Sequence, residues 1–220
     1  MSLNTASAFA VSVLRGGRGM KVRQALKFQP AVPLELYEFE SCPFCKKVRE
    51  VLSELDLEYV SRASARGSHH RENFAREGKK NSFPHLVDPN TDTALYESED
   101  IIDYLYNTYG IGRNGVGKLL SPLNTVSAIV ASAVRWRGST VSGNARTTQP
   151  AELLELYNFE ASPYCRKVRE ALCELDLDCR IRNVAKNSER RDQLKEAGGK
   201  VMVPYLIDPN TETQMYESDE

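Results

Sequence analysis

The chain contains Ser41-Cys42-Pro43-Phe44-Cys45-Lys46-Lys47-Val48-Arg49 and, 120 residues later, a second copy that reads Ala161-Ser162-Pro163-Tyr164-Cys165-Arg166-Lys167-Val168-Arg169. Each copy predicts a helix start, because proline at the first helical position loses no N–H that the helix needs. One difference between the copies matters chemically, since Ser162 stands where the first copy has Cys42.

The residues around the first copy predict a small α/β domain. Apolar and polar residues alternate over 34–39, which indicates a strand that leads into the helix, and a parallel strand is expected over 57–61. Helix, strand, strand and helix then follow over 68–78, 83–88, 94–96 and 98–109, with Ser98 as a cap. The order β-α-β-α-β-β-α predicts a four-stranded mixed sheet.

This domain is duplicated. Residues 34–100 and 154–220 align without a gap and are identical at about half of the positions. Ser218-Asp219-Glu220 matches Ser98-Glu99-Asp100, so the second domain lacks the counterpart of the last helix. A sheet without that cover should expose apolar surface, which favours a fragment. The predicted division is a leader over 1–33, domain 1 over 34–110, a linker over 111–153 and domain 2 over 154–220.

Two segments lie outside the repeats. Residues 1–33 carry five basic and no acidic residues, which fits either a disordered basic leader or an organelle transit peptide. The linker contains an expected amphipathic helix over about 122–136. A basic amphipathic helix can lie on a membrane or an acidic partner. Packing between the two domains is the favoured interpretation, and packing between two copies of the chain is an alternative. The apolar stripe of this expected helix comprises Leu123, Val126, Ile129, Val130, Ala133 and Val134.

Composition excludes several classes of protein. The net charge of −1 provides no global field for nucleic acid, and no apolar run is long enough to cross a bilayer. Five cysteines form an odd set without framework spacing, which argues against a secreted disulfide scaffold. A C-x-x-C beside a strand–helix pattern indicates redox or metal chemistry instead.

Cys42 is the candidate nucleophile. The thiol of a free cysteine has a pKa near 8.5, which falls to about 3.5–7.5 at a helix N-terminus in a C-x-x-C. Unpaired backbone N–H groups and the helix dipole favour the thiolate there, and the positive charges that follow in the sequence should add to the effect. Cys45 lies on the same side of the helix and is expected to be the more buried, resolving thiol. The positive charges that should favour the Cys42 thiolate are those of Lys46, Lys47 and Arg49.

Other interpretations of the cysteines stay open. Half a zinc site would need a second pair of ligands, and no C-x-x-C or H-x-x-x-H supplies one. An iron–sulfur cluster shared by two chains is a further alternative. Cys45 is also in phase with Val48 and Leu52, as a core residue would be, and this packing interpretation is stronger for Cys165, which has no cysteine partner at 162.

The motifs C-P-F-C, V-R, F-P-H-L and Y-E-S occur in this order and again, with small changes, in the second repeat. This arrangement resembles the N-terminal, thioredoxin-like domain of glutathione S-transferases and the related glutaredoxins. The tandem form resembles a two-domain plastid family of plants and algae. The resemblance covers nearly everything from Leu34 onward. It implies a plastid location, with the cytoplasm as the alternative, and glutathione as the cofactor.

The resemblance also assigns roles to residues. It implies cis peptide bonds at Pro84 and Pro204, with the backbone of the preceding residue pairing with the cysteinyl part of glutathione. An acid–hydroxyl pair before the last helix would hold the γ-glutamyl end, because a helix N-terminus suits a carboxylate; a plain helix cap is compatible with this role. The residues in these two roles are Phe83, Val203, Glu97, Ser98, Glu217 and Ser218.

The second repeat offers another site at Ser162 and Cys165. Some transferase classes use a serine at this position to hydrogen-bond the glutathione thiolate, but a serine cannot exchange disulfides. A decayed site that keeps Ser162 as a helix cap is the alternative. The residues between the repeats are too few for the helical second domain of a full transferase, which disfavours detoxifying conjugation.

The predicted function is a glutathione-linked thiol–disulfide oxidoreductase that acts on glutathionylated or disulfide substrates. A transferase-like enzyme that uses Ser162 or Cys42 is one alternative. A non-catalytic module that binds glutathione or an iron–sulfur cluster is the other.

Overall fold

A computed structural model describes residues 3–24, 26–145 and 148–218. The elements of the first repeat are β1 (Leu34–Glu38), α2 (Pro43–Glu54), β2 (Tyr59–Ala63), α3 (His69–Arg76), β3 (His85–Asp88), β4 (Thr93–Leu95) and α4 (Ser98–Thr108). Those of the second are β5 (Leu154–Asn158), α7 (Pro163–Glu174), β6 (Cys179–Asn183), α8 (Arg190–Gly198), β7 (Tyr205–Asp208) and β8 (Thr213–Tyr216). The predicted order is confirmed. None of the described helices is long and apolar enough to cross a membrane.

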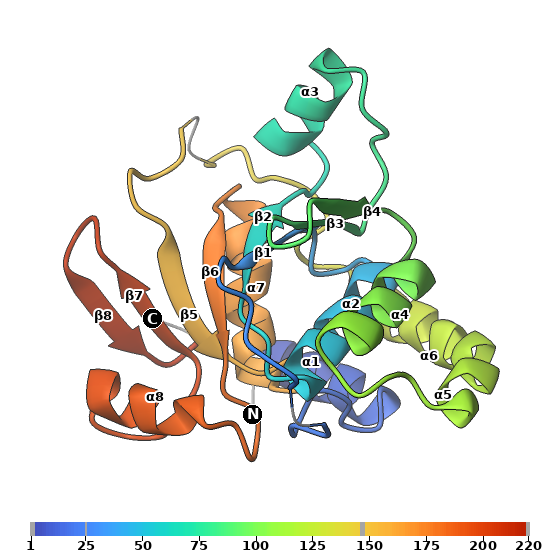
Figure 1. Ribbon diagram of the computed structural model, residues 1–220. Coiled ribbons are helices and arrows are strands. Elements are labelled where there is room, and N and C mark those ends of the chain that lie inside the picture. Colours follow the sequence, from blue (N-terminus) through green and yellow to red (C-terminus); the bar gives the residue numbers. More distant parts are fainter. Residues whose placement is uncertain (1–2, 25, 146–147, 219–220) are drawn as a thin grey trace.

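The two repeats share one sheet. Its strand order is β4-β3-β1-β2-β6-β5-β7-β8, with β1 parallel to β2 and β5 parallel to β6 (Figure 1). The prediction of two separate four-stranded sheets is therefore wrong in one respect, because β2 and β6 pair in antiparallel fashion and fuse them. Each would otherwise be an edge strand with unpaired N–H and C=O groups, and their pairing removes both edges.

A pseudo-twofold axis relates the repeats. In the central strand pair Val60 lies opposite Arg180, its own counterpart in the second repeat, so the axis passes through this pair of residues. On one face of the sheet Leu36 and Leu52 of the first repeat belong to the same apolar cluster as Leu156 and Ile181 of the second. The repeats are thus halves of one folded unit with a common core.

Residues 3–14 form a helix, which corrects the prediction that residues 1–33 are disordered. Helix α1 (Leu3–Leu14) packs against α7 of the second repeat and against α6 (Ser121–Val134). The reason is visible in the sequence: Leu3-Asn4-Thr5 recurs as Leu123-Asn124-Thr125, again 120 residues later. The duplication therefore includes a helix before each strand pattern, and the segment between the repeats is the second copy of this helix, preceded by the short α5 (Gly115–Leu119).

Basic residues near the N-terminus pair with acids of the fold. The Arg15 guanidinium contacts the Glu50 carboxylate of α2 at 2.6 Å and donates to the Asn124 carbonyl of α6 at 2.8 Å. The axis repeats both contacts, because Arg135 pairs with the Glu170 carboxylate of α7 and donates to the Asn4 carbonyl of α1 at 2.8 Å. Arg15 therefore joins the first turn of α6 to α2, and Arg135 joins the first turn of α1 to α7.

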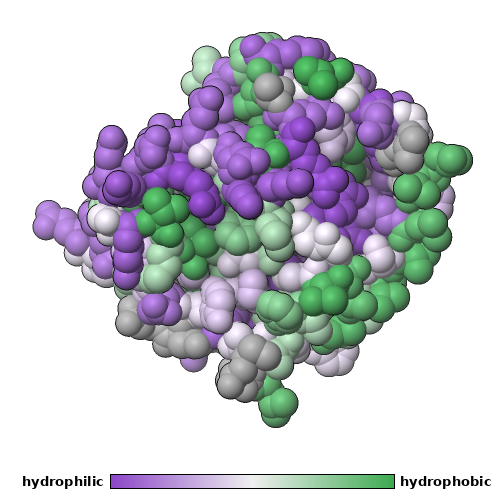
Figure 2. Space-filling view, turned by 90° about the horizontal axis from the view of Figure 1, so that it is seen from below, coloured by the Kyte–Doolittle hydropathy of each residue, from purple (hydrophilic) through white to green (hydrophobic). Residues whose placement is uncertain are grey.

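The apolar stripe of α6 faces outward, so the prediction that it packs between the domains is wrong. Val126, Ile129 and Val134 are each about half exposed, whereas Ala128 and Ala131 are completely buried. Helices α1 and α6 pack through small residues, which let the backbones approach closely. Hydrophobic residues consequently gather on the side of the molecule where α1 and α6 lie (Figure 2).

Candidate functional site

Cys42 caps helix α2, as the sequence predicts. Its sulfur accepts a hydrogen bond from the Cys45 backbone N–H at 3.2 Å, and Pro43 occupies the first helical position. The strand β1 ends just before this turn, so the sulfur lies where a strand meets the positive end of a helix dipole. The arrangement presents a sulfur to backbone donors, which stabilise it as a thiolate.

The two thiols of the C-x-x-C have opposite ionisation behaviour. Burial disfavours the Cys42 thiolate, but hydrogen bonds from the Cys45 thiol and from the N–H groups of Cys45 and Phe44, together with the charge of Arg49, bring the pKa of Cys42 below its ordinary value. Burial, the neighbouring Cys42 thiolate and Glu38 raise the pKa of Cys45 well above the ordinary value. Cys42 is thus the thiol that ionises first.

Access to Cys42 is more restricted than the motif suggests. The residue is 3% exposed and Cys45 is completely covered, while the neighbouring Phe44 ring is 42% exposed. Reactive cysteines are usually partly exposed. Cys42 is therefore more covered than a typical reactive cysteine.

The cations that follow the motif do not form a free positive patch beside Cys42, contrary to expectation. Lys46, Lys47 and Arg49 are all buried. Lys46 lies 3.5 Å from the Glu40 carboxylate, Lys47 pairs with Glu99, and Arg49 pairs with Glu40 at 3.0 Å. Because carboxylates balance these charges, the helix N-terminus is the main source of positive potential at the sulfur.

The loop before β3 completes the surroundings of Cys42. The Phe83–Pro84 peptide bond is cis, as the resemblance implies, and the Cys42 sulfur lies 3.9 Å from the Phe83 carbonyl oxygen. Arg71 of α3 places its guanidinium 4.5 Å from the centre of the Phe83 ring and donates to the Ser64 carbonyl at 2.8 Å. Burial lowers the pKa of Arg71, and the charges of Cys45 and Cys42 oppose this shift.

Arg71 is a site residue that the motifs alone do not indicate. One signal was available, however: α3 and α8 differ at most positions, but both repeats keep an arginine here, Arg71 and Arg191. A cation fixed beside the thiol pair suits an acidic ligand.

The predicted γ-glutamyl site lies at the start of α4. Helix α4 begins at Ser98, and Glu97 is the residue before it, so Ser98 is the first helical residue and not the cap. Glu97 has φ 48°, a left-handed conformation that is unusual for a residue with a side chain, and its counterpart Glu217 has φ 74°. The Glu97 carboxylate is exposed and lies 3.0 Å from the Lys80 ammonium. Such outliers are concentrated at functional sites.

The second repeat keeps the geometry of the first. Ser162 caps α7, and its hydroxyl oxygen accepts a hydrogen bond from the Cys165 N–H at 3.2 Å. The Val203–Pro204 bond is also cis. Burial raises the pKa of the Cys165 thiol, and Glu217 and Ser218 follow β8 as Glu97 and Ser98 follow β4. This site has the backbone geometry of the first, with a serine in place of Cys42.

In a comparison with protein families, the glutathione S-transferase N-terminal domain matches residues 36–115 and 156–220, in agreement with the architecture. The chain belongs to this family. A search of the curated proteins found no match, and neither did a search of the solved structures. The protein therefore carries two glutathione S-transferase N-terminal domains fused through one sheet.

A buried ring of charges lies behind the two transferase-type sites, on the axis. Arg49 contacts Glu160 at 3.0 Å, and its counterpart Arg169 contacts Glu40 at 2.9 Å. Each arginine also pairs with the acid of its own repeat. The V-R pair that follows each site motif thus has a structural role, since its arginine joins one transferase-type domain to the other.

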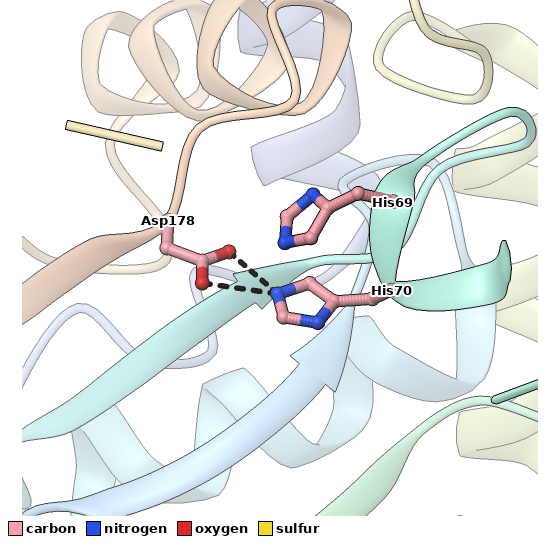
Figure 3. A group of neighbouring side chains, drawn as sticks. All are labelled: His69, His70 and Asp178. Atoms are coloured by element: carbon pink, nitrogen blue, oxygen red, sulfur yellow. Dashed lines mark hydrogen bonds and ion pairs between the residues drawn. The ribbon is translucent and has the colours of Figure 1, made fainter. Parts of the chain in front are cut away.

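One cluster has the residue types of a metal site. His69 and His70 of α3 approach Asp178 from the other repeat, and among the described residues this is the sole group of three metal-ligand types; Cys42 and Cys45 are not in one (Figure 3). The Asp178 carboxylate, however, already accepts from His70 at 2.9 Å, from Arg62 at 2.9 Å and from the Ala63 N–H at 3.0 Å.

The equivalent position in the other repeat shows that this cluster is a contact between the repeats. At the equivalent place Glu58 accepts from Arg190 at 2.8 Å and from Arg182 at 3.0 Å. Arg190 is the counterpart of His70, and an arginine is always charged and binds no metal. A metal ion would also have to compete with Arg62 for the oxygens of Asp178. The position therefore holds a side chain that binds the carboxylate of the other repeat and joins the two transferase-type domains.

Proposed function

We propose that the protein is a glutathione-linked thiol–disulfide oxidoreductase with one dithiol site, formed by Cys42 and Cys45. The supporting observation is the opposite ionisation of two thiols at one helix start beside a cis proline. Pairs of titratable groups whose surroundings push their pKa values apart have separate chemical roles. Cys42 is the nucleophile in this proposal.

The exchange proceeds in two steps. The Cys42 thiolate attacks the glutathione sulfur of a mixed disulfide, a Cys42–glutathione disulfide forms, and the substrate sulfur leaves as a thiolate that takes up a proton. A second glutathione thiolate then attacks the glutathione sulfur on Cys42, which releases oxidised glutathione and restores the Cys42 thiolate. Alternatively, Cys45 attacks the Cys42 sulfur and expels glutathione. The first route is favoured, because the raised pKa of Cys45 leaves little thiolate for the attack.

Residues around the first site suit the peptide part of glutathione. The backbone of Phe83 beside the cis bond would pair with the cysteinyl residue, and the Glu97–Ser98 turn at the N-terminus of α4 would hold the γ-glutamyl end. Arg71, fixed over the Phe83 ring, would meet a carboxylate of the ligand. Three anchors around one sulfur favour glutathione over a bulky protein disulfide as the group that Cys42 takes.

Mass spectrometry tests the proposal. Wild type, Cys42→Ser, Cys45→Ser and Cys165→Ser are incubated with oxidised glutathione and their intact masses are measured. We expect one glutathione adduct on Cys45→Ser, the loss of that adduct when Cys42 is replaced as well, and no effect of Cys165→Ser, since Cys165 is buried in the site without a nucleophile. An adduct that survives the loss of Cys42, or a Cys42 that never takes one, would overturn the proposal.

The second repeat supports a different role. Ser162 holds its hydroxyl as Cys42 holds its sulfur, so the second site would bind glutathione through Ser162, Val203, Pro204, Glu217 and Ser218 without exchange. A transferase-like activity here is the alternative. Conjugation of glutathione to a chlorinated aromatic that survives Cys42→Ser but not Ser162→Ala would move the chemistry to this repeat. Brown colour after purification under nitrogen would indicate an iron–sulfur cluster instead.

A plastid location is a separate proposal. Because α1 is folded and its following arginine pairs with Glu50, the basic composition of residues 1–33 has a structural cause, and the plastid proposal rests on the family resemblance. Imaging of the chain with a C-terminal fluorescent tag in leaf cells would test it.

A further inference from the structure

A pocket lined by three arginines lies at the start of β1, whereas Cys42 follows the end of this strand. The pocket has a volume of about 310 Å³, and Pro33, the residue before β1, borders it. Its charged side chains come from β6, from the first residue of α8 and from the turn before β2. The lining residues besides Pro33 are Gln29, Pro30, Ala31, Glu58, Arg180, Arg182, Arg190 and Gln193.

The three arginines share one carboxylate in the pocket. Glu58 accepts hydrogen bonds from Arg190 at 2.8 Å, from Arg182 at 3.0 Å and from Arg180 at 3.1 Å. Burial disfavours the charge of Glu58, but the arginines hold its pKa below the ordinary value. A guanidinium has five N–H donors and a carboxylate accepts about four hydrogen bonds. The arginines therefore hold more donors than Glu58 can accept.

Two of the arginines pair with a second acid. Arg182 pairs with Glu155 at 2.7 Å, and Arg190 pairs with Asp56 at 3.1 Å. Neither of these acids is among the described residues that line the pocket. A ligand inside the pocket therefore meets three guanidinium groups and one carboxylate.

Arg180 is the arginine that the duplicated fold does not require. The residue related to it by the pseudo-twofold axis is Val60, which lies directly opposite, so an aliphatic side chain satisfies this position of the sheet. The Nε–H of Arg180 is buried and has no hydrogen-bond partner among the described residues, although the side chain as a whole is 34% exposed. Buried donors without a partner are rare in folded proteins. This donor and its position in the pocket indicate a missing acceptor.

The axis-related place in the first repeat shows that the cluster of arginines is specific to this side. There the acid is Asp178, which accepts from Arg62 and from the ring of His70. With Val60 on the axis, that side has one arginine where the pocket has three. The contact between the repeats is thus made with fewer permanent charges, and the additional arginines are available for a second role.

We propose that the pocket binds a small phosphate monoester, with Arg180, Arg182 and Arg190 as the groups that hold the phosphate. A phosphate monoester carries a charge of about −1.5 to −2 at pH 7 and three strong acceptor oxygens, which suits three guanidinium groups better than a second single-charged carboxylate. Pockets for small molecules have volumes of about 300–1,000 Å³. This pocket is at the lower limit, so it accommodates the phosphate and a short carbon skeleton, which would lie against Pro30, Ala31 and Pro33.

Phenyl phosphate serves as the probe, because it joins a phosphate to a compact apolar ring. The full chain is titrated with it at constant ionic strength, and the heat of binding is measured by isothermal titration calorimetry. We expect one site per chain with a Kd in the micromolar to low millimolar range. Phenol should not bind, and benzoate should bind about tenfold more weakly or worse, because it has fewer charges and acceptor oxygens.

Variants of the chain locate the binding. Arg180→Met removes the unpartnered donor, and Gln193→Glu adds a like charge at an exposed position of α8 beside the pocket. Each should weaken binding by about tenfold or more, since a hydrogen bond to a charged group contributes about 1.5–3 kcal/mol. Arg66→Met is the matched control, because it removes an exposed arginine outside the pocket and should leave binding unchanged. Far-UV circular dichroism shows which variants are folded, and Gln193→Glu decides if Arg180→Met does not fold.

Three results would overturn the proposal. The first is the absence of saturable binding, and the second is binding that the folded pocket variants do not weaken. The third is an equal loss on Arg66→Met, because net charge and not the pocket would then attract the probe. Cys42→Ser should bind phenyl phosphate as the wild type does, so this result is independent of the thiol chemistry.

Discussion

The buried charge ring between the repeats predicts a large loss of stability on Glu160→Gln. Glu160 is 3% exposed and contacts Arg49 at 3.0 Å and Arg169 at 2.9 Å. Burial disfavours its charge, but Arg169 and Arg49 hold the pKa of Glu160 below the ordinary value. The substitution keeps the size of the side chain and removes the charge that faces both arginines.

The structure sets the size of the effect. Among the ion pairs of this region in the described chain, three carboxylates face four cations, so the removal of one acid leaves buried positive charge without compensation. The loss of one partner of a buried ion pair costs about 3–5 kcal/mol. For a chain of this size each kcal/mol corresponds to about 2–4 °C in Tm, so Tm should fall by about 6–20 °C.

Urea unfolding followed by far-UV circular dichroism measures the change; the single tryptophan, Trp136, is 76% exposed and would be a poor fluorescent probe. Glu77→Gln is the matched control, since its pair with Lys79 at 2.7 Å lies on the surface and should contribute nothing measurable. A loss below about 1 kcal/mol for Glu160→Gln, or two separate unfolding transitions in wild type, would refute the view that the ring holds two halves of one cooperative unit.

Three further predictions concern ionisation and packing. Because the pKa of Cys42 is lowered, alkylation of Cys45→Ser should continue to lower pH than alkylation of glutathione, and an equal or higher midpoint would contradict this. The hydrogen bond that the His69 ring donates to the Asp176 carboxylate raises the pKa of His69. The contribution of this pair to stability is therefore full below about pH 6.5 and is lost as the pH rises through the higher, folded-state pKa. His69→Gln should abolish that part of the pH dependence of the free energy of unfolding. Ile129→Asp on the exposed face of α6 should change stability by no more than about 0.5 kcal/mol, whereas Ala128→Asp, one position away and completely buried, should prevent normal folding.

Local patterns were sufficient for the elements and for the centre of the candidate site. The alternation over 34–39 and the proline after Cys42 predict β1 and α2, because both depend on neighbouring residues only. The N-cap at Cys42 follows from the same turn. The repeat of Leu3-Asn4-Thr5 lies before the first strand and outside the aligned segments 34–100 and 154–220, so the pattern of the strands alone does not predict α1.

Properties that depend on contacts between distant residues could not be predicted in this way. Lys46 and Lys47 follow Cys42 closely in the sequence, which suggests that their charges act on its thiol. In the fold, however, Lys46 pairs with Glu40 and Lys47 pairs with Glu99. Arg71 reaches the thiols only because α3 folds back over the loop that contains Phe83.

The duplicated sequence alone specifies two copies of one β-α-β-α-β-β unit, a further helix after the first copy and a thiol pair in that copy, because strand period, helix starts and turn residues act over a few positions. Tertiary structure decided that the copies form one sheet through β2 and β6, since an edge strand finds its partner only when segments 120 residues apart meet. It also decided which face of α6 is buried, because small residues pack where two helices come close and the large apolar ones remain outside.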